Sequence, residues 1–156
     1  MKYKIFASLT LCGLATVALA AEVSFRNDIR PLLKAQCGEC HGDESPSLPD
    51  FLQQQEKFKK EKTGPRLSTY GDLAQVIVWP DSGAFMRRLD DGSSSANKKP
   101  GNMYKYLGET DALRAANLKV IKEWVGEGAW NLNRWDTEGG VAAVSKEQLD
   151  RIKLKY

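Results

Sequence analysis

The pattern Cys-x-x-Cys-His at residues 37–41 constrains this chain more than any other part of its sequence. Two thiols and an imidazole fall within five residues, and His41 is the only histidine of the chain. Cys37 and Cys40 are two of only three cysteines. Whatever the fold is, it has to bring these three side chains to one place, and the chemistry there has to use them together.

Covalent attachment of a c-type haem fits both the spacing and the order of the pattern. Two thiols separated by two residues can each bond one of the vinyl groups on one edge of the haem, and an imidazole that follows at once can ligate the iron. Cys37 and Cys40 would then carry the thioether bonds, and His41 would be the proximal axial ligand. We therefore favour a single covalently bound haem c as the cofactor.

Three other interpretations of the pattern stay open at this point. A structural zinc site needs four nitrogen or sulfur ligands, and adjacent Cys40 and His41 cannot easily face one tetrahedral ion. A dithiol redox centre is typical of chains that alternate strands and helices, an alternation not evident here. A structural disulfide followed by an unrelated histidine is the last alternative.

Residues 1–20 are typical of a secretory signal peptide. Lys2 and Lys4 precede an apolar run, and Ala18-Leu19-Ala20 provides a small-x-small cleavage site. The run is short for a membrane-spanning helix, which needs ~20 apolar residues. We therefore expect cleavage after Ala20, export to the periplasm, and a mature chain without a membrane span.

Loss of this leader changes both the charge and the cysteine content. The formal net charge of the chain is +3, and Lys2 and Lys4 supply two of these charges, so the mature chain is close to neutral. This balance argues against nucleic acid as a partner. Only Cys37 and Cys40 remain after cleavage, and two free thiols in an oxidising compartment pair or are consumed by another reaction. Bonds to haem would consume both.

Hydrophobic periodicity predicts several helices. We expect them over residues 24–36, 51–64, 81–92 and 109–130, with a short one after Ser145, whereas 66–80 is too short to assign as strand or helix. Polar residues mark the expected caps, which are Asn27 or Asp28, Asp50, Asp81 or Ser82, and Thr110. Ser145 is expected to cap the last short helix in a capping box with Gln148. The expected apolar stripe of the longest helix comprises Leu113, Ala116, Val120 and Trp124, joined by Ile121 and Val125.

A haem iron bound by His41 alone would be five-coordinate, so the sixth ligand decides the function. Two methionines follow the leader, Met86 and Met103. Met86 lies in an apolar helical stripe that explains it as a core residue. Met103 lies in a loop before the last long helix, where a thioether can reach iron without distorting a helix. We predict Met103 as the distal ligand, with Met86 as the second choice.

With these residues in place, the chain resembles the monohaem class I c-type cytochromes. The resemblance is carried by F-x-x-D-I-x-P-x-L before the haem motif, and by a loop methionine followed by a helix that ends W-V-x-x-G-A. It covers residues 25–130. The corresponding residues here are Phe25, Asp28, Ile29, Pro31, Leu33, Met103, Trp124, Val125, Gly128 and Ala129. The subgroup usually carries Met-Pro-Pro at the ligand loop, whereas here Tyr104 and Lys105 follow Met103.

The resemblance implies an all-α cytochrome c fold, one covalent haem c with His/Met ligation, and electron transfer with transient redox partner proteins. We expect an electron carrier rather than an enzyme. The expected organisation is a signal peptide (1–20), a cytochrome domain (21–135) with a surface insertion at 43–64, and a tail (136–156) with a short amphipathic helix. Alternatively, the chain is a fixed haem subunit of a dehydrogenase or reductase, docked through this tail. Without Met103 as ligand, it would be a five-coordinate protein that binds small gases or peroxide.

Four further side chains are candidates for contacts with the haem propionates or the haem pocket. Arg66 and Arg87 qualify because arginine pairs well with carboxylates, and so does the neighbouring Arg88. Trp79 is the fourth. Surface salt bridges are the alternative role for the arginines, and core packing is the alternative for Trp79.

Overall fold

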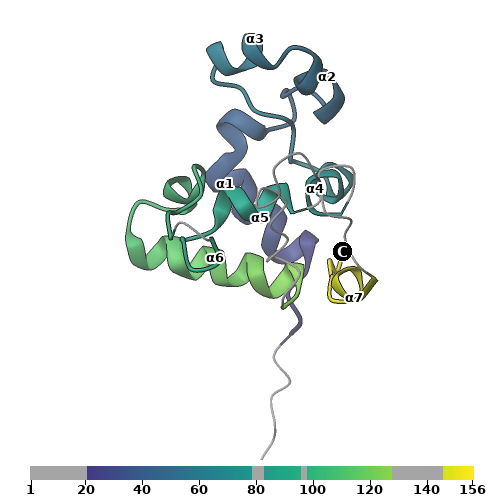
Figure 1. Cartoon of the computed structure of the whole chain (residues 1–156), viewed down its shortest axis with the longest axis vertical. Coiled ribbons are helices and arrows are strands. Elements are labelled where there is room, and N and C mark those ends of the chain that lie inside the picture. The colour runs from purple at the N-terminus through teal and green to yellow at the C-terminus, as the bar shows by residue number, and fades with distance from the viewer. Residues whose placement is uncertain (1–20, 79–82, 96–97, 128–145) are drawn as a thin grey trace, which may run out of the picture.

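The computed structural model describes residues 21–78, 83–95, 98–127 and 146–156. All regular elements in this part of the chain are helices (Figure 1), which confirms the predicted all-α fold class. They are a π-helical turn η1 (Phe25–Ile29), α1 (Arg30–His41), α2 (Leu48–Gln53), α3 (Gln55–Lys60), α4 (Tyr70–Ile77), α5 (Ala84–Leu89), the 3₁₀ turn η2 (Tyr104–Leu107), α6 (Asp111–Val125) and α7 (Lys146–Leu149). The predicted leader and the predicted caps Asp81, Ser82 and Ser145 lie outside the described residues.

The first helical segment has an earlier N-cap than predicted and continues beyond the predicted end at residue 36. Ser24, rather than Asn27 or Asp28, is its N-cap: the Ser24 hydroxyl accepts from the Asn27 N–H at 3.2 Å, and the Asp28 carboxylate accepts in return from the Ser24 N–H at 2.8 Å. Helix α1 then runs through the whole Cys-x-x-Cys-His pattern and ends at His41. The pattern is therefore carried on helical backbone.

Turn η1 packs against both α1 and α6, and α4 packs against α5. Side chains of these elements form most of the core, and Figure 1 shows how the elements are arranged. The buried face of α6 comprises Leu118, Ile121, Trp124 and Val125. The predicted stripe is wrong at its start, because Ala116 is exposed and Leu113 is 41% exposed. Thr110 is the N-cap as predicted, and the helix ends at Val125.

The undecided segment 66–80 contains a helix, α4. Thr69 and Asp72 form a capping box at its start, in which each side chain accepts from the backbone N–H of the other. Asp72 is buried and also holds Arg66, with Arg66 Nε 3.0 Å from Asp72 Oδ2. Helix α5 follows and buries Phe85, Met86 and Leu89, as its apolar pattern predicts.

Residues 42–67, which we call the proximal lobe, lie between α1 and α4. The single helix predicted over 51–64 is instead two short helices, broken at Gln54, and Ser47 rather than Asp50 is the N-cap. Helices α2 and α3 stand at one end of the molecule (Figure 1), where the Phe51 and Phe58 rings stack at a centroid distance of 6.0 Å. Whether 43–64 is an insertion relative to the family stays a prediction.

The last six residues pack against η1 and the end of α6. The N–H of Leu154 donates to the Trp124 carbonyl at 3.1 Å, and the N–H of Phe25 donates to the Lys155 carbonyl at 2.7 Å. Leu154 is buried, and the exposed ring of Tyr156 stacks on Phe25 at 5.8 Å. The division into a domain ending at 135 and a separate tail stays a prediction, but residues 151–156 are part of the packed body.

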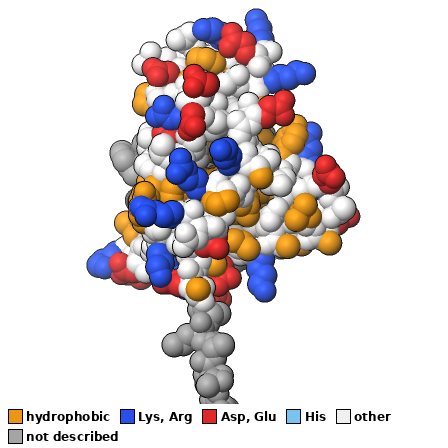
Figure 2. Space-filling view, turned by 180° about the vertical axis from the view of Figure 1, so that it is seen from behind, with side chains coloured by type: hydrophobic (Ala, Val, Ile, Leu, Met, Phe, Trp, Pro, Cys, Tyr) orange, Lys and Arg blue, Asp and Glu red, His pale blue; other side chains and the backbone are white. Residues whose placement is uncertain are grey.

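Charges of both signs are interspersed over the face seen in Figure 2, with hydrophobic side chains between them in its middle part. This face therefore presents no field of a single sign. No helix among the described residues has the length and apolar character needed to cross a membrane.

Candidate functional site

The last turns of α1 carry the thiols. Cys37 and Cys40 are both half-buried and neither forms a disulfide, which argues against the disulfide alternative. Burial, together with the nearby Cys40, raises the pKa of the Cys37 thiol to about 11. The Cys37 side chain packs against the hydrophobic core, so at least one of the two thiols faces the interior of the protein.

The imidazole of His41 is fixed by one ring nitrogen. Its Nδ1 lies 2.7 Å from the carbonyl oxygen of Pro65. A carbonyl can only accept, so Nδ1 carries the proton and donates it, and the lone pair is on Nε2. Burial lowers the pKa of His41, the hydrogen bond to Pro65 opposes this, and the charge of Arg88 adds to the lowering. The ring is therefore neutral at pH 7, which is the form that ligates metals.

Gly64 lets the backbone come this close to the ring. A Cβ at residue 64 would collide with Cε1 of His41, so any other residue type would push the chain away. The Gly64 N–H donates to the Cys40 carbonyl at 2.8 Å, and the Leu67 N–H to the His41 carbonyl at 3.0 Å. The contacts of Gly64 and Pro65 with His41 were not predicted. The Gly-Pro pair stands at the end of a predicted helix, but its contact with residue 41 depends on the path of the proximal lobe between them.

The two methionines occupy different environments. Met86 is 2% exposed and is enclosed in the core on α5. Met103 is half-buried, packs against the edge of the core, and immediately precedes η2. Its backbone N–H donates to the carbonyl of Arg88 at 2.9 Å. Because η2 packs against α1, the loop of Met103 lies beside the helix that carries the cysteines and His41.

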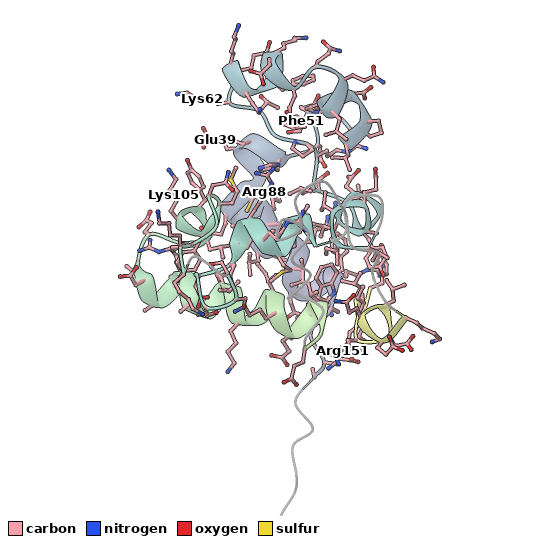
Figure 3. All side chains as sticks on the ribbon, in the orientation of Figure 1. Glu39, Phe51, Lys62, Arg88, Lys105 and Arg151 are labelled. Carbon is pink, nitrogen blue, oxygen red and sulfur yellow. The ribbon has the colours of Figure 1, made fainter. Side chains whose placement is uncertain are left out.

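The predicted propionate contacts fall in different places. Arg66 forms a two-point ion pair with Asp72, with the second contact, Nη2 to Oδ1, at 3.2 Å. Arg87 is half-buried on α5, and Trp79 lies outside the described residues. Arg88 is exposed near the end of α5, close enough for its charge to act on His41. Figure 3 shows Arg88 and Glu39 beside the C-terminal half of α1, with Lys105 nearby.

Comparisons with known proteins place the chain in a family. The sequence profile of the PccH cytochrome c family matches residues 24–156. The chain belongs to this family. The solved structure of the monohaem cytochrome PccH from Geobacter sulfurreducens is similar to it, with a TM-score of 0.74 and 42% sequence identity, over 87% of this chain and 100% of that one. No curated protein matches the sequence.

Membership of the PccH cytochrome c family identifies the chain as a monohaem c-type cytochrome with the cytochrome c fold and one covalently attached haem c. It is an electron-transfer haem protein. The described residues fit this cofactor, since Cys37 and Cys40 are free and the imidazole of His41 is neutral and oriented. Among the described residues, no group of three or more His, Cys, Asp or Glu side chains is arranged to hold a metal ion.

Proposed function

We propose that this PccH-family protein is an exported electron carrier that binds haem c through Cys37 and Cys40 and ligates the iron with His41 and Met103. The bound haem supplies a one-electron Fe(III)/Fe(II) couple. The protein contributes the covalent attachment, the two axial ligands and an apolar enclosure. We further propose that it works in the periplasm, since its first 20 residues have the pattern of a cleaved leader.

The hydrogen bond from His41 Nδ1 to the Pro65 carbonyl is the observation that carries the proposal. Such a bond on the second ring nitrogen fixes the tautomer and the orientation of a ligating imidazole, and it increases the basicity of the ligating nitrogen. His41 follows directly after Cys40 at the end of α1. The geometry therefore supports Nε2 as the proximal ligand atom of a haem bonded to the same helix.

Met103 is the better-placed methionine for the distal position. A thioether ligand in place of a second imidazole raises the reduction potential. The core side chains Phe25, Ile29, Leu33, Ile121 and Trp124 are all 4% exposed or less, and an apolar enclosure disfavours the extra charge of ferric iron. The thioether ligand and the apolar enclosure therefore both raise the reduction potential. With both axial positions filled, exogenous molecules are kept from the iron and single-electron transfer is the remaining activity.

The partners on this proposal are redox proteins that bind transiently. Small interfaces suit such encounters, and the near-neutral mature sequence does not specify a strongly charged partner. No role for nucleic acid follows from this charge.

Absorption spectra of the purified holoprotein, oxidised and reduced, with a redox titration, test the proposal. We expect a six-coordinate low-spin ferric spectrum with the long-wavelength methionine–iron band, and a single one-electron transition. High-spin ferric iron, or rapid carbon monoxide binding by the reduced protein, would instead support a five-coordinate gas or peroxide site.

Variants of the attachment residues test the covalent bonds separately. A Cys37→Ala/Cys40→Ala double variant is expected to lose haem staining on a denaturing gel, whereas each single variant retains one thioether and part of the stain. A stain that survives in the double variant would refute the assignment. Stoichiometric co-purification of a second protein with the wild type would favour the subunit alternative over a free carrier.

A further inference from the structure

The segment Gly101–Gly108, which we call the methionine segment, is fastened at its start to the end of α5. The Gly101 N–H donates to the Asp90 carbonyl at 2.8 Å, and the Met103 N–H donates to the Arg88 carbonyl at 2.9 Å. Carbonyls in the last turn of a helix have no intrahelical partner. The end of α5 therefore offers acceptors, and the backbone on both sides of Asn102 uses them.

Gly101 is required for this contact. A Cβ at residue 101 would collide with the backbone carbonyl groups of Arg87 and Arg88. These are backbone atoms of a helix rather than the end of a flexible side chain, so they cannot yield without displacement of the segment or of α5. A larger residue at position 101 would displace the backbone only two residues before Met103, and so would move the Met103 sulfur.

The other end of the methionine segment is fastened to α6. The side-chain amide of Asn117 donates to the Leu107 carbonyl at 2.6 Å, and Arg114 Nη1 donates to the Gly108 carbonyl at 2.8 Å. Leu107 itself is fully buried. Met103 thus lies between two anchored points, one on each neighbouring helix.

The α5 anchor also lies near the proximal side of the site. The carbonyl of Arg88 accepts from Met103, and the guanidinium of the same residue is close enough to His41 for its charge to act on the imidazole. The last turn of α5 therefore contacts the loop of Met103, the expected distal ligand, and also lies near His41, the expected proximal ligand.

We propose that Gly101 and Asn117 are positioning residues that hold Met103 at the iron, in place of the two prolines that stiffen this loop in related cytochromes. The inference rests on the proposed function, because it takes Met103 as the distal ligand. The proline-free sequence after Met103 is then compatible with a rigid ligand loop, since rigidity comes from hydrogen bonds to two helices.

Competition by an exogenous ligand measures this role directly. Imidazole binds ferric iron only when the methionine has left, so its apparent affinity rises with the population of the detached state. A hydrogen bond that keeps the methionine attached lowers that population. A residue with a merely structural role would change the melting temperature without changing the imidazole affinity.

The experiment titrates imidazole into the ferric holoproteins of wild type, Gly101→Ala and Asn117→Ala. We expect both variants to bind imidazole about tenfold more tightly than wild type, since one buried hydrogen bond corresponds to roughly that change in an equilibrium constant. Gly71→Ala is the matched glycine control, because a Cβ there meets no atom closer than 3.9 Å. Glu123→Ala, at an exposed position of α6, is the control for Asn117. Both control variants should bind imidazole with the affinity of wild type.

The outcomes distinguish a failure of the positioning role from a failure of the assignment of Met103 as the ligand. Wild-type imidazole affinity in both variants, with only a lower melting temperature, would overturn the positioning role. If Gly101→Ala yields no holoprotein, Asn117→Ala decides by the same criterion. A Met103→Ala variant run in parallel should lose the methionine–iron band. If it keeps the band, the ligand assignment is wrong, and the positioning inference falls with it.

Discussion

The Nδ1 atom of His41 and the carbonyl oxygen of Pro65, 24 positions apart in the chain, lie 2.7 Å apart. The proximal lobe separates them. It begins at Gly42, after the end of α1, and returns to that helix where the Gly64 N–H donates to the Cys40 carbonyl. The orientation of the imidazole is thus controlled by the path of a loop rather than by the helix that carries it. Changes in that loop should therefore be detected at the iron.

Gly64→Ala should destabilise the protein. The added Cβ would collide with the His41 ring, and relief of this overlap has to displace the Pro65 carbonyl or the imidazole. We expect a loss of about 1–3 kcal/mol in the free energy of unfolding and a lower yield of holoprotein. Denaturant unfolding of the ferric protein, with haem quantified on a gel, measures both. Gly71→Ala is the control. Equal losses of stability and of holoprotein in the two variants would show that Gly64 does not closely approach the His41 ring.

Met103→Ala and Met86→Ala should have opposite signatures. Met103→Ala should lose the methionine–iron band and lower the reduction potential, because a sulfur ligand raises that potential, with a smaller effect on the packing of the core. Met86→Ala should keep the band and lose about 2–5 kcal/mol of stability, because it leaves a cavity in the core. Redox titration and denaturant unfolding of both variants give the comparison. The reverse pattern would assign Met86 as the ligand.

Asp72 should make folding stability depend on pH in the acid range. Burial alone would raise the pKa of Asp72, but hydrogen bonds from Arg66 and Thr69 outweigh it, so the pKa lies below its usual value. The native state then binds its proton at lower pH than the unfolded chain does. The contribution is present above about pH 4, the usual pKa of an unfolded aspartate, and is lost as the pH falls through the native value.

Asp72→Asn should therefore be less stable at pH 7 and less sensitive to acid. We expect a loss of about 1 kcal/mol at pH 7, a modest value because the Arg66 partner is 36% exposed and solvent screens the pair. Urea unfolding of wild type and variant at pH 7 and at pH 3 provides the test. The difference between their free energies of unfolding should be smaller at pH 3 than at pH 7. A constant difference would mean that Asp72 acts as a helix cap rather than through its charge.

Removal of residues 151–156 should destabilise the whole body. Leu154 is buried, and backbone hydrogen bonds join this segment to Phe25, Trp124 and Val125. We expect a loss of at least about 3 kcal/mol in the free energy of unfolding. Tyr156→Ala, which removes a ring that is 60% exposed, should cost about 1 kcal/mol. If the deletion were as mild as the point variant, the segment would be a passive tail.

The helical class and the longest helix could be predicted because periodicity and caps are local signals. Thr110 is followed by an apolar periodic segment, and both are recognisable without knowledge of the rest of the fold. The prediction was wrong at the start of the buried face of α6, where Leu113 is exposed. Periodicity shows which residues share a face, but only the neighbouring elements determine how much of that face is covered.

The motif residues 37–41 were found for the same reason, since their order and spacing are local. The hydrogen-bond partner of His41 was not predicted, because it is Pro65, 24 positions later in the chain, and the sequence pattern does not give the fold of the segment between them. The anchors of Met103 were missed too. Gly101 and Asn117 act through hydrogen bonds to backbone carbonyls, and backbone acceptors leave no mark in the sequence.

Lys155 pairs with Glu22 across 133 positions of sequence, and its carbonyl oxygen accepts from Phe25 and from the Trp124 indole. Contacts between such distant residues close a very long loop, and the conformational entropy lost on closing that loop opposes their formation. We expect this closure to be a late step in folding. The π-helical turn and the start of α1 would then remain incompletely covered until it occurs, while the thiols of α1 can already react. The order of events during maturation would thus be set by the end of the chain farthest from the haem motif.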